Sequence, residues 1–127
     1  MKILITGAAG FIGMHSSLKF LNSKFSVLGI DNLNDYYDRN LKLKRLNLLK
    51  ENKKFKFRKV DISNYNSLKK IFDEFRPDFV LHLAAQAGVR HSIKKPWDYT
   101  KSNLVGFANI LECSKNSNIR HLVFASS

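Results

Sequence analysis

Three glycines near the start of the chain are spaced so that the backbone around them could hold a diphosphate. Gly7, Gly10 and Gly13 follow the apolar residues Ile3 to Ile5, in the order Thr-Gly-Ala-Ala-Gly-Phe-Ile-Gly. The first glycine would allow a tight turn, the second a close approach of backbone amides to a ligand, and the third close packing of a helix on a sheet. A helix starting here would point its free N–H groups and positive dipole end at the anion.

An acidic residue, Asp31, ends the next apolar segment and lies 18 residues after Gly13. This is close to the offset of ~20 residues at which a carboxylate reaches the ribose hydroxyls of a bound dinucleotide. The carboxylate would repel a ribose 2′-phosphate, and no arginine follows it directly, so the pattern favours NAD over NADP. The order of strand, glycines, helix, strand and acid predicts a dinucleotide site, with a purely structural turn as the competing interpretation.

The apolar residues alternate along the chain between the spacings of strands and of helices. Strands are expected at residues 2–6, 25–30, 55–60, 79–83 and 121–125, and helices at 11–22, 40–50, 65–75 and 97–116. The segment from Phe79 to Leu83 is almost continuously apolar, which is typical of a central parallel strand covered on both faces.

This alternation predicts an α/β fold of the Rossmann type, a doubly wound parallel sheet of five strands in the order 3-2-1-4-5. We expect one NAD-binding domain over residues 1–127, with its ligand at the carboxyl ends of the strands. The chain stops at the end of a predicted strand, which would leave the sheet with an open edge. We therefore expect a C-terminally truncated protein that lacks the last strands and a substrate domain.

Most of the net charge of +12 has one source, the stretch from Arg39 to Lys59, which holds ten basic residues and one acid. A solvated, lysine-rich surface is the favoured interpretation, so nucleic acid is not an expected partner. Binding to nucleic acid or to an acidic membrane is the alternative.

The cysteine and histidine content argues against a disulfide and against a zinc site. Cys113 is the only cysteine, and the four histidines lie far apart in the sequence. No apolar run approaches the ~20 residues that cross a bilayer. Met1 and Lys2 lead directly into the first predicted strand, so we expect no signal peptide. We expect a cytoplasmic protein without a metal.

Four segments carry a family resemblance: Thr6 to Gly13, Gly29 to Asp38, His82 to Arg90 and Ser102 to Gly106. They resemble the N-terminal part of the extended short-chain dehydrogenases/reductases, among them the NAD-dependent nucleotide-sugar epimerases and dehydratases. The glycine motif is shared by that whole superfamily. The stretches Asp-Asn-Leu-Asn-Asp-Tyr-Tyr-Asp and Ala-Ala-Gln-Ala-Gly-Val-Arg resemble more specifically the branch that epimerises UDP-glucuronate at C4.

The resemblance implies a set of NAD-binding residues. They are Gly7, Gly10, Phe11, Ile12, Gly13, Asp31, Asn32, Asp61, Ile62, Leu83, Ala84, Ala85 and Asn103. Asp61 and Ile62 would border the adenine, and residues 83–85 the nicotinamide ribose, where plain strand packing is the alternative. Asn103 would brace the loop after the fourth strand, or act only as a cap or surface residue. Arg90 would bind the UDP-sugar through its planar fork, or be only a surface charge.

The chemistry that the resemblance implies is a transient oxidation of the sugar at C4, followed by return of the hydride to its other face. Ser127 aligns with the hydroxyl residue that hydrogen-bonds the reacting oxygen. The family's Tyr-x-x-x-Lys pair is expected beyond residue 127, so the chain alone should not turn over. Tyr65 and Lys69 have that spacing, but they fall in a predicted helix away from the active-site edge.

Several alternatives remain open from the sequence. The same fold serves other nucleotide-sugar 4-epimerases, 4,6-dehydratases and UDP-glucuronate decarboxylases. The chain could also be a catalytically dead basic binding module or a truncated gene product. Family members are commonly homodimers, which would require the full-length protein.

Overall fold

The computed structural model describes residues 1–127 and contains one parallel sheet of five strands. The strands are β1 (Lys2–Thr6), β2 (Ser26–Asp31), β3 (Phe55–Lys59), β4 (Phe79–His82) and β5 (His121–Phe124). Their order across the sheet is β3-β2-β1-β4-β5, and all four neighbouring pairs are parallel. The predicted fold class and strand order are confirmed.

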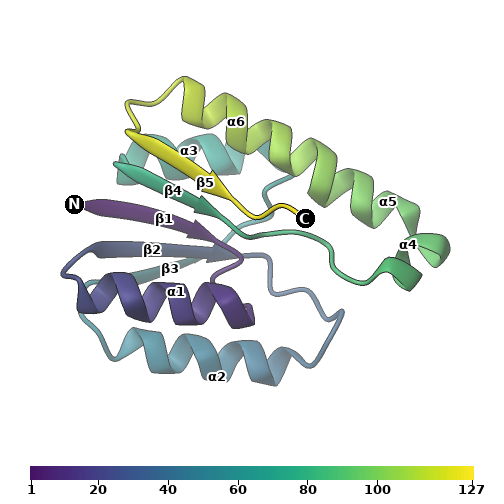
Figure 1. Cartoon of the computed structure of the whole chain (residues 1–127), viewed down its shortest axis with the longest axis horizontal. Helices are drawn as coiled ribbons and strands as arrows, with labels where there is room; N and C mark the ends of the chain where they lie inside the picture. Colours follow the sequence, from purple (N-terminus) through teal and green to yellow (C-terminus); the bar gives the residue numbers. More distant parts are fainter.

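Helices cover both faces of the sheet (Figure 1). On one face lie α1 (Phe11–Asn22) and α2 (Arg39–Lys50), and on the other lie α3 (Tyr65–Phe75) and α6 (Phe107–Lys115). Two short helices, α4 (Val89–Lys94) and α5 (Pro96–Tyr99), lie beyond the carboxyl edge of the sheet. A π-helical segment, η1 (Thr100–Gly106), joins α5 to α6. None of these helices is long and apolar enough to cross a lipid bilayer.

The core has two halves because alternate side chains of a strand point to opposite faces of the sheet. Ile3 and Ile5 of β1 pack on the side of α1 and α2, together with Leu46 of α2. Leu4, between them in sequence, packs with Phe72 of α3 and other residues on the opposite side. Burial on both faces explains why the central strands are almost continuously apolar.

The strand register brings the carboxyl ends of the central strands to one edge. Thr6 at the end of β1 is paired with Ile30 of β2 on one side and with His82 of β4 on the other. The chain leaves β1 towards one face and β4 towards the other, so the winding direction changes between these two strands. A change of winding opens a crevice at this edge, where ligands of such sheets bind.

The helices differ from prediction in two places. Residues 89–94 form α4, where no helix was expected, and the helix predicted over 97–116 is divided into α5, η1 and α6. In the wide turns of η1, Gly106 comes so close to Ile62 that a Cβ at Gly106 would lie 2.6 Å from the Ile62 side chain. The other boundaries agree with the predicted ones to within one residue.

Candidate functional site

The loop after β1 depends on the absence of side chains at its glycines. Gly7 has a φ of +68°, and a Cβ there would lie 2.9 Å from the backbone nitrogen of Ala84. A Cβ at Gly13 would lie 2.1 Å from the carbonyl oxygen of Gly7. The Gly10 N–H donates to that same oxygen at 3.0 Å. The loop is therefore packed tightly against α1 and against the segment that follows β4.

The N-terminus of α1 is open towards the edge of the sheet. Its N-cap residue, Gly10, has no side chain to cap the helix, and the first turn contains no acidic residue. Phe11 and Ile12 are exposed, while Gly13 is buried. The first N–H groups of a helix have no partner within it, and the dipole is positive at this end. This is an environment in which a diphosphate is stabilised.

Asp31 joins the end of β2 to the glycine loop. Its carboxylate accepts hydrogen bonds from the N–H of Ala9 at 3.2 Å and from the N–H of Leu33 at 2.8 Å. The residue is only 8% exposed, yet it lines a cavity together with Asn32. Two backbone donors hold the carboxylate in place at the point where the sequence predicted a ribose contact.

Asp61 and Ile62 form part of another wall of this cavity. The Asp61 carboxylate accepts two hydrogen bonds from Ser63, at 2.9 Å from its N–H and 2.7 Å from its hydroxyl, and lies 3.3 Å from the ammonium of Lys101. Partial burial alone would raise the pKa of Asp61, but the bonds from Ser63 and the charge of Lys101 outweigh it and lower that pKa. The carboxylate is therefore ionised at neutral pH. The carbonyl of Ile62 accepts from the side chain of Asn109 at 2.9 Å.

The backbone after β4 is fixed by a threonine of β1. The Thr6 hydroxyl oxygen accepts the N–H groups of Leu83 and Ala84, both at 3.0 Å, and lies 2.7 Å from Nδ1 of His82. His82 is buried, and burial lowers its pKa to about 4. Leu83, Ala84 and Ala85 line the cavity beside the glycine loop. His82 thus makes a structural hydrogen bond at the end of β4.

Asn103 connects η1 to the loop that follows β4. Its side-chain oxygen accepts from the N–H of Gln86 at 2.8 Å, and its side-chain nitrogen donates to the Gln86 carbonyl at 3.2 Å. The same asparagine lines a second hollow beside the cavity, with Phe107 and Phe124. One amide thus satisfies both backbone groups of a single residue and fixes the loop.

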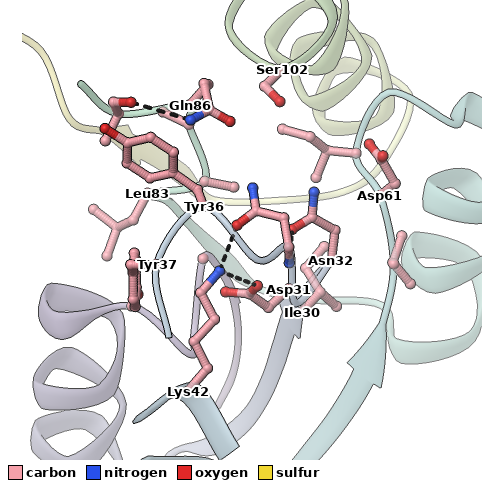
Figure 2. Close-up of a pocket in the computed structure, with 18 residues that line it drawn as sticks. Ile30, Asp31, Asn32, Tyr36, Tyr37, Lys42, Asp61, Leu83, Gln86 and Ser102 are labelled. Carbon is pink, nitrogen blue, oxygen red and sulfur yellow. Dashed lines mark hydrogen bonds and ion pairs between the residues drawn. The ribbon is translucent and has the colours of Figure 1, made fainter. Parts of the chain in front are cut away.

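Most of the residues predicted to bind the cofactor meet in one cavity at the carboxyl edge of the sheet (Figure 2). Those that line it are Gly7, Gly10, Asp31, Asn32, Asp61, Ile62, Leu83, Ala84 and Ala85. They come from four separate segments that are up to 78 residues apart in the chain.

The remaining predicted residues lie outside this cavity. Arg90 is exposed on α4, and Ser127 is exposed after the end of β5. Neither lines the cavity or the hollow at Asn103. Tyr65 packs against the core on α3, and Lys69 pairs with Asp73 of the same helix, so the two do not form a catalytic pair.

The cavity also contains residues that were not predicted to bind. Its lining is completed by other residues, among them Asn34, Tyr36, Tyr37, Lys42, Gln86, Ala87 and Ser102. The interpretation of the basic stretch as a solvated surface is wrong for Lys42, which is only 5% exposed. Its position on the inner side of α2 could not be inferred because the leucines of this helix are spread over too wide an arc to define one face.

Comparison with solved structures shows that this fold is similar to that of nucleotide-sugar epimerases. The UDP-glucuronic acid 4-epimerase of Bacillus cereus, solved with UDP-glucuronic acid and NAD, is 37% identical, with a TM-score of 0.91, over 100% of this chain and 40% of that one. The UDP-glucose 4-epimerase of Thermotoga maritima, solved with UDP-glucose, is 33% identical, with a TM-score of 0.87, over 100% of this chain and 38% of that one.

Curated sequences agree with the structural comparison. Protein CapI of Staphylococcus aureus is 53% identical over 128 residues, which span 100% of this chain and 38% of that protein. The UDP-glucuronate 4-epimerase of Thermodesulfobacterium geofontis is 48% identical over 124 residues, which span 98% of this chain and 38% of that protein. The chain thus spans well under half the length of these relatives.

A family model described as GDP-mannose 4,6 dehydratase matches residues 4–127, nearly the whole chain. The matched region contains the glycine loop, Asp31 and the residues after β4 that form the cavity. The resemblance inferred from the sequence is confirmed, and the chain belongs to the GDP-mannose 4,6 dehydratase family, in the region that corresponds to the N-terminal part of its epimerase relatives.

Proposed function

We propose that this chain is the NAD-binding part of a nucleotide-sugar 4-epimerase and that its sugar substrate is UDP-glucuronate. The observation that carries the proposal is the cavity in which the glycine loop, Asp31 and Asp61 meet. The similarity to epimerases solved with NAD, one of them with UDP-glucuronic acid, supports it.

The residues of the cavity fit a dinucleotide. A side chain at Gly7 or Gly13 would collide with backbone atoms, so the loop requires glycine at both positions. Because glycine has no side chain, the backbone amides of the loop remain uncovered beside the open N-terminus of α1. The diphosphate would lie there, and the Asp31 carboxylate would accept hydrogen bonds from the adenosine ribose. Asp61, held ionised, would accept a hydrogen bond from the adenine amino group beside the apolar side chain of Ile62.

NAD, when bound, would accept the hydride from C4 of the sugar and return it. The chain's own residues would position the two reactants for this transfer. Leu83, Ala84 and Ala85 would provide small, flat surfaces beside the nicotinamide ribose, with the backbone of the first two fixed by Thr6. On the sugar side, Arg90 would bind the uronic carboxylate or the diphosphate, and the Ser127 hydroxyl would hydrogen-bond the reacting oxygen.

We further propose that the chain alone binds the cofactor without turnover. Proton removal from the sugar hydroxyl requires a base. The family resemblance assigns this role to a Tyr-x-x-x-Lys pair. The one pair with this spacing here, Tyr65 and Lys69, is not available because the lysine is bound to Asp73. The base would therefore come from residues outside this chain.

The first experiment is a calorimetric titration of the purified chain with NAD. We expect saturable binding at one site, and loss of most of the binding in Asp31→Ala. The matched control is Lys70→Ala, because Lys70 is exposed on α3 and does not line the cavity. A folded chain that does not bind NAD would refute the proposal.

The second experiment tests the activity. This chain is joined in frame to the part of the Thermodesulfobacterium geofontis epimerase that follows the aligned region. We expect the chimera to convert UDP-glucuronate to its 4-epimer, whereas the chain alone with NAD should not. Arg90→Ala in the chimera should raise the KM for UDP-glucuronate more than the KM for UDP-glucose. A folded chimera that binds NAD but is inactive on UDP-glucuronate would contradict the proposed substrate.

A 4,6-dehydratase is the second candidate because the matching family model is described by that activity. The two reactions share the oxidation at C4 and differ in whether water is then eliminated. The decisive measurement is the product formed from GDP-mannose and from UDP-sugars by a protein that contains this chain. A 4-keto-6-deoxy sugar would identify a dehydratase, and an inverted C4 hydroxyl would identify an epimerase.

A further inference from the structure

Lys42 is the only lysine or arginine that is buried in this chain. It lies in the first turn of α2, and its side chain extends towards the end of β2, where it lines the cavity (Figure 2). Lys44, two positions later on the same helix, is exposed. A buried ammonium is unfavourable unless other groups compensate its charge. The groups around the Lys42 ammonium must therefore compensate its positive charge.

The ammonium of Lys42 lies among three polar or aromatic groups. Its Nζ donates to the side-chain oxygen of Asn34 at 2.9 Å and lies 3.7 Å from the nearer carboxylate oxygen of Asp31. It also lies 4.8 Å from the centre of the Tyr37 ring. An ammonium has three N–H donors, and only the one to Asn34 makes a hydrogen bond here. The Asp31 carboxylate already accepts hydrogen bonds from two backbone N–H groups. Lys42 lies farther from this carboxylate than those groups and compensates its negative charge as an ion pair.

This arrangement changes the electrostatics of the ribose position. A single carboxylate at the end of β2 would strongly repel a phosphate on the ribose 2′-oxygen. With the ammonium beside it, the pair has no net formal charge, so the repulsion is reduced. The unused donors of Lys42 are also suited to a phosphate oxygen, because hydrogen bonds between charged groups are stronger than neutral ones.

We propose that Lys42 is a cofactor-specificity residue that recognises the 2′ position of the adenosine ribose and weakens the discrimination of this site against NADP. The inference rests on the proposed function, since it requires an NAD-type dinucleotide in the cavity. With NAD, Asp31 accepts the ribose hydroxyls and Lys42 holds Asp31 and Asn34 in place. With NADP, Lys42 donates to the 2′-phosphate and offsets its repulsion by Asp31.

The first test compares the affinities for NAD and NADP by calorimetric titration of the whole chain. Lys42→Met removes the charge and keeps most of the length of the unbranched side chain, while Lys44→Met makes the same change of net charge on the exposed side of α2. We expect Lys42→Met to raise the preference for NAD over NADP by about tenfold or more, the contribution of one hydrogen bond to a charged group. Lys44→Met should leave the preference unchanged.

The second test removes the opposing charge. Asp31→Asn should bind NADP more tightly than NAD because Lys42 then faces the 2′-phosphate without a competing carboxylate. Adding Lys42→Met to this variant should abolish that preference. A double variant that still favours NADP to the same extent would overturn the role of Lys42.

The outcomes separate this inference from the proposed function. If the parent chain binds NAD and Lys42→Met leaves the ratio of the two affinities unchanged, the role of Lys42 is wrong and the proposed function stands. If the folded parent chain binds neither cofactor, both are wrong. Circular dichroism checks the fold of each variant, and Lys42→Gln, which can still donate to Asn34, replaces Lys42→Met if the latter does not fold.

Discussion

The hydroxyl of Thr6 lies 2.7 Å from Nδ1 of His82, and the direction of this hydrogen bond is fixed by its surroundings. Both lone pairs of the Thr6 oxygen are used, because it accepts the N–H groups of Leu83 and Ala84. Its own hydrogen must therefore be donated to His82, whose Nδ1 acts as an acceptor and carries no proton. The neutral ring is also stacked on Phe107, with 5.3 Å between centroids. Protonation of His82 would thus disrupt the backbone that lines the cavity.

The stability of the chain should depend on the protonation of His82. Burial lowers the pKa of this histidine from 6.5 to about 4 in the folded state. Since the unfolded chain binds the proton more readily, the stabilising contribution is present above pH 6.5 and is lost as the pH falls to about 4. We expect the free energy of unfolding to fall by about 3 kcal/mol over this interval from His82 alone.

Urea unfolding of the parent chain and of His82→Asn at pH 7 and at pH 4 measures this contribution. The asparagine keeps an acceptor near Thr6 but does not titrate in this range. The variant should be less stable at pH 7 and should lose less stability on acidification. Equal losses in the two proteins would show that His82 does not titrate as described.

Replacing Thr6 by valine should destabilise the chain and weaken NAD binding. Valine keeps the shape of threonine but removes the oxygen that accepts from Leu83 and Ala84 and donates to His82. Buried groups left without partners cost about 1–3 kcal/mol each, so we expect a total loss of about 3 kcal/mol. Thr6→Ser retains the hydroxyl and should recover most of the stability. Thermal unfolding and NAD titration give the two readouts, and a fully stable valine variant would contradict the assigned role.

A single methyl group at Gly13 should prevent the glycine loop from adopting its conformation. A Cβ there would lie 2.1 Å from the carbonyl oxygen of Gly7, a backbone atom that cannot move aside without shifting the loop. We expect Gly13→Ala to lower the free energy of unfolding by about 1–3 kcal/mol and to reduce the affinity for NAD at least tenfold. His15→Ala, at an exposed position of the same helix, is the control. Unchanged NAD affinity in a stable Gly13→Ala chain would exclude this loop as the diphosphate site.

The parts of the fold that depend on local pattern could be predicted from the sequence. Apolar runs at strand spacing gave the five strands, and the alternation with helices gave the order of the sheet, because right-handed crossovers leave few arrangements. Gly7 and Asp31 could be identified as candidates because the chemistry of the site requires those residue types at that spacing.

The features that could not be predicted depend on contacts between distant residues. Lys42 looked like any other lysine of a basic helix, and only the packing of α2 places it 3.7 Å from Asp31. The π-helical turns around Asn103 are fixed by contacts with the loop at Gln86 and with Ile62, which no local pattern records. The helix α4 has no buried residue, so it has no apolar face that could reveal it in the sequence.

The two hydrogen bonds of Asn103 can be tested by a substitution that keeps the shape of the side chain and replaces its N–H donor by an acceptor. In Asn103→Asp, the oxygen that replaces the amide nitrogen would face the carbonyl of Gln86, now 3.2 Å from that nitrogen, and two acceptors would repel each other. The bond to the Gln86 N–H at 2.8 Å could still form. We therefore expect faster hydrogen exchange in the loop after β4 and several-fold weaker NAD binding, with little change in global stability. Asn109→Asp on α6, where the amide donates to the Ile62 carbonyl, loses a similar bond away from this loop and serves as the control. If both variants exchange equally at Gln86, Asn103 does not brace the loop.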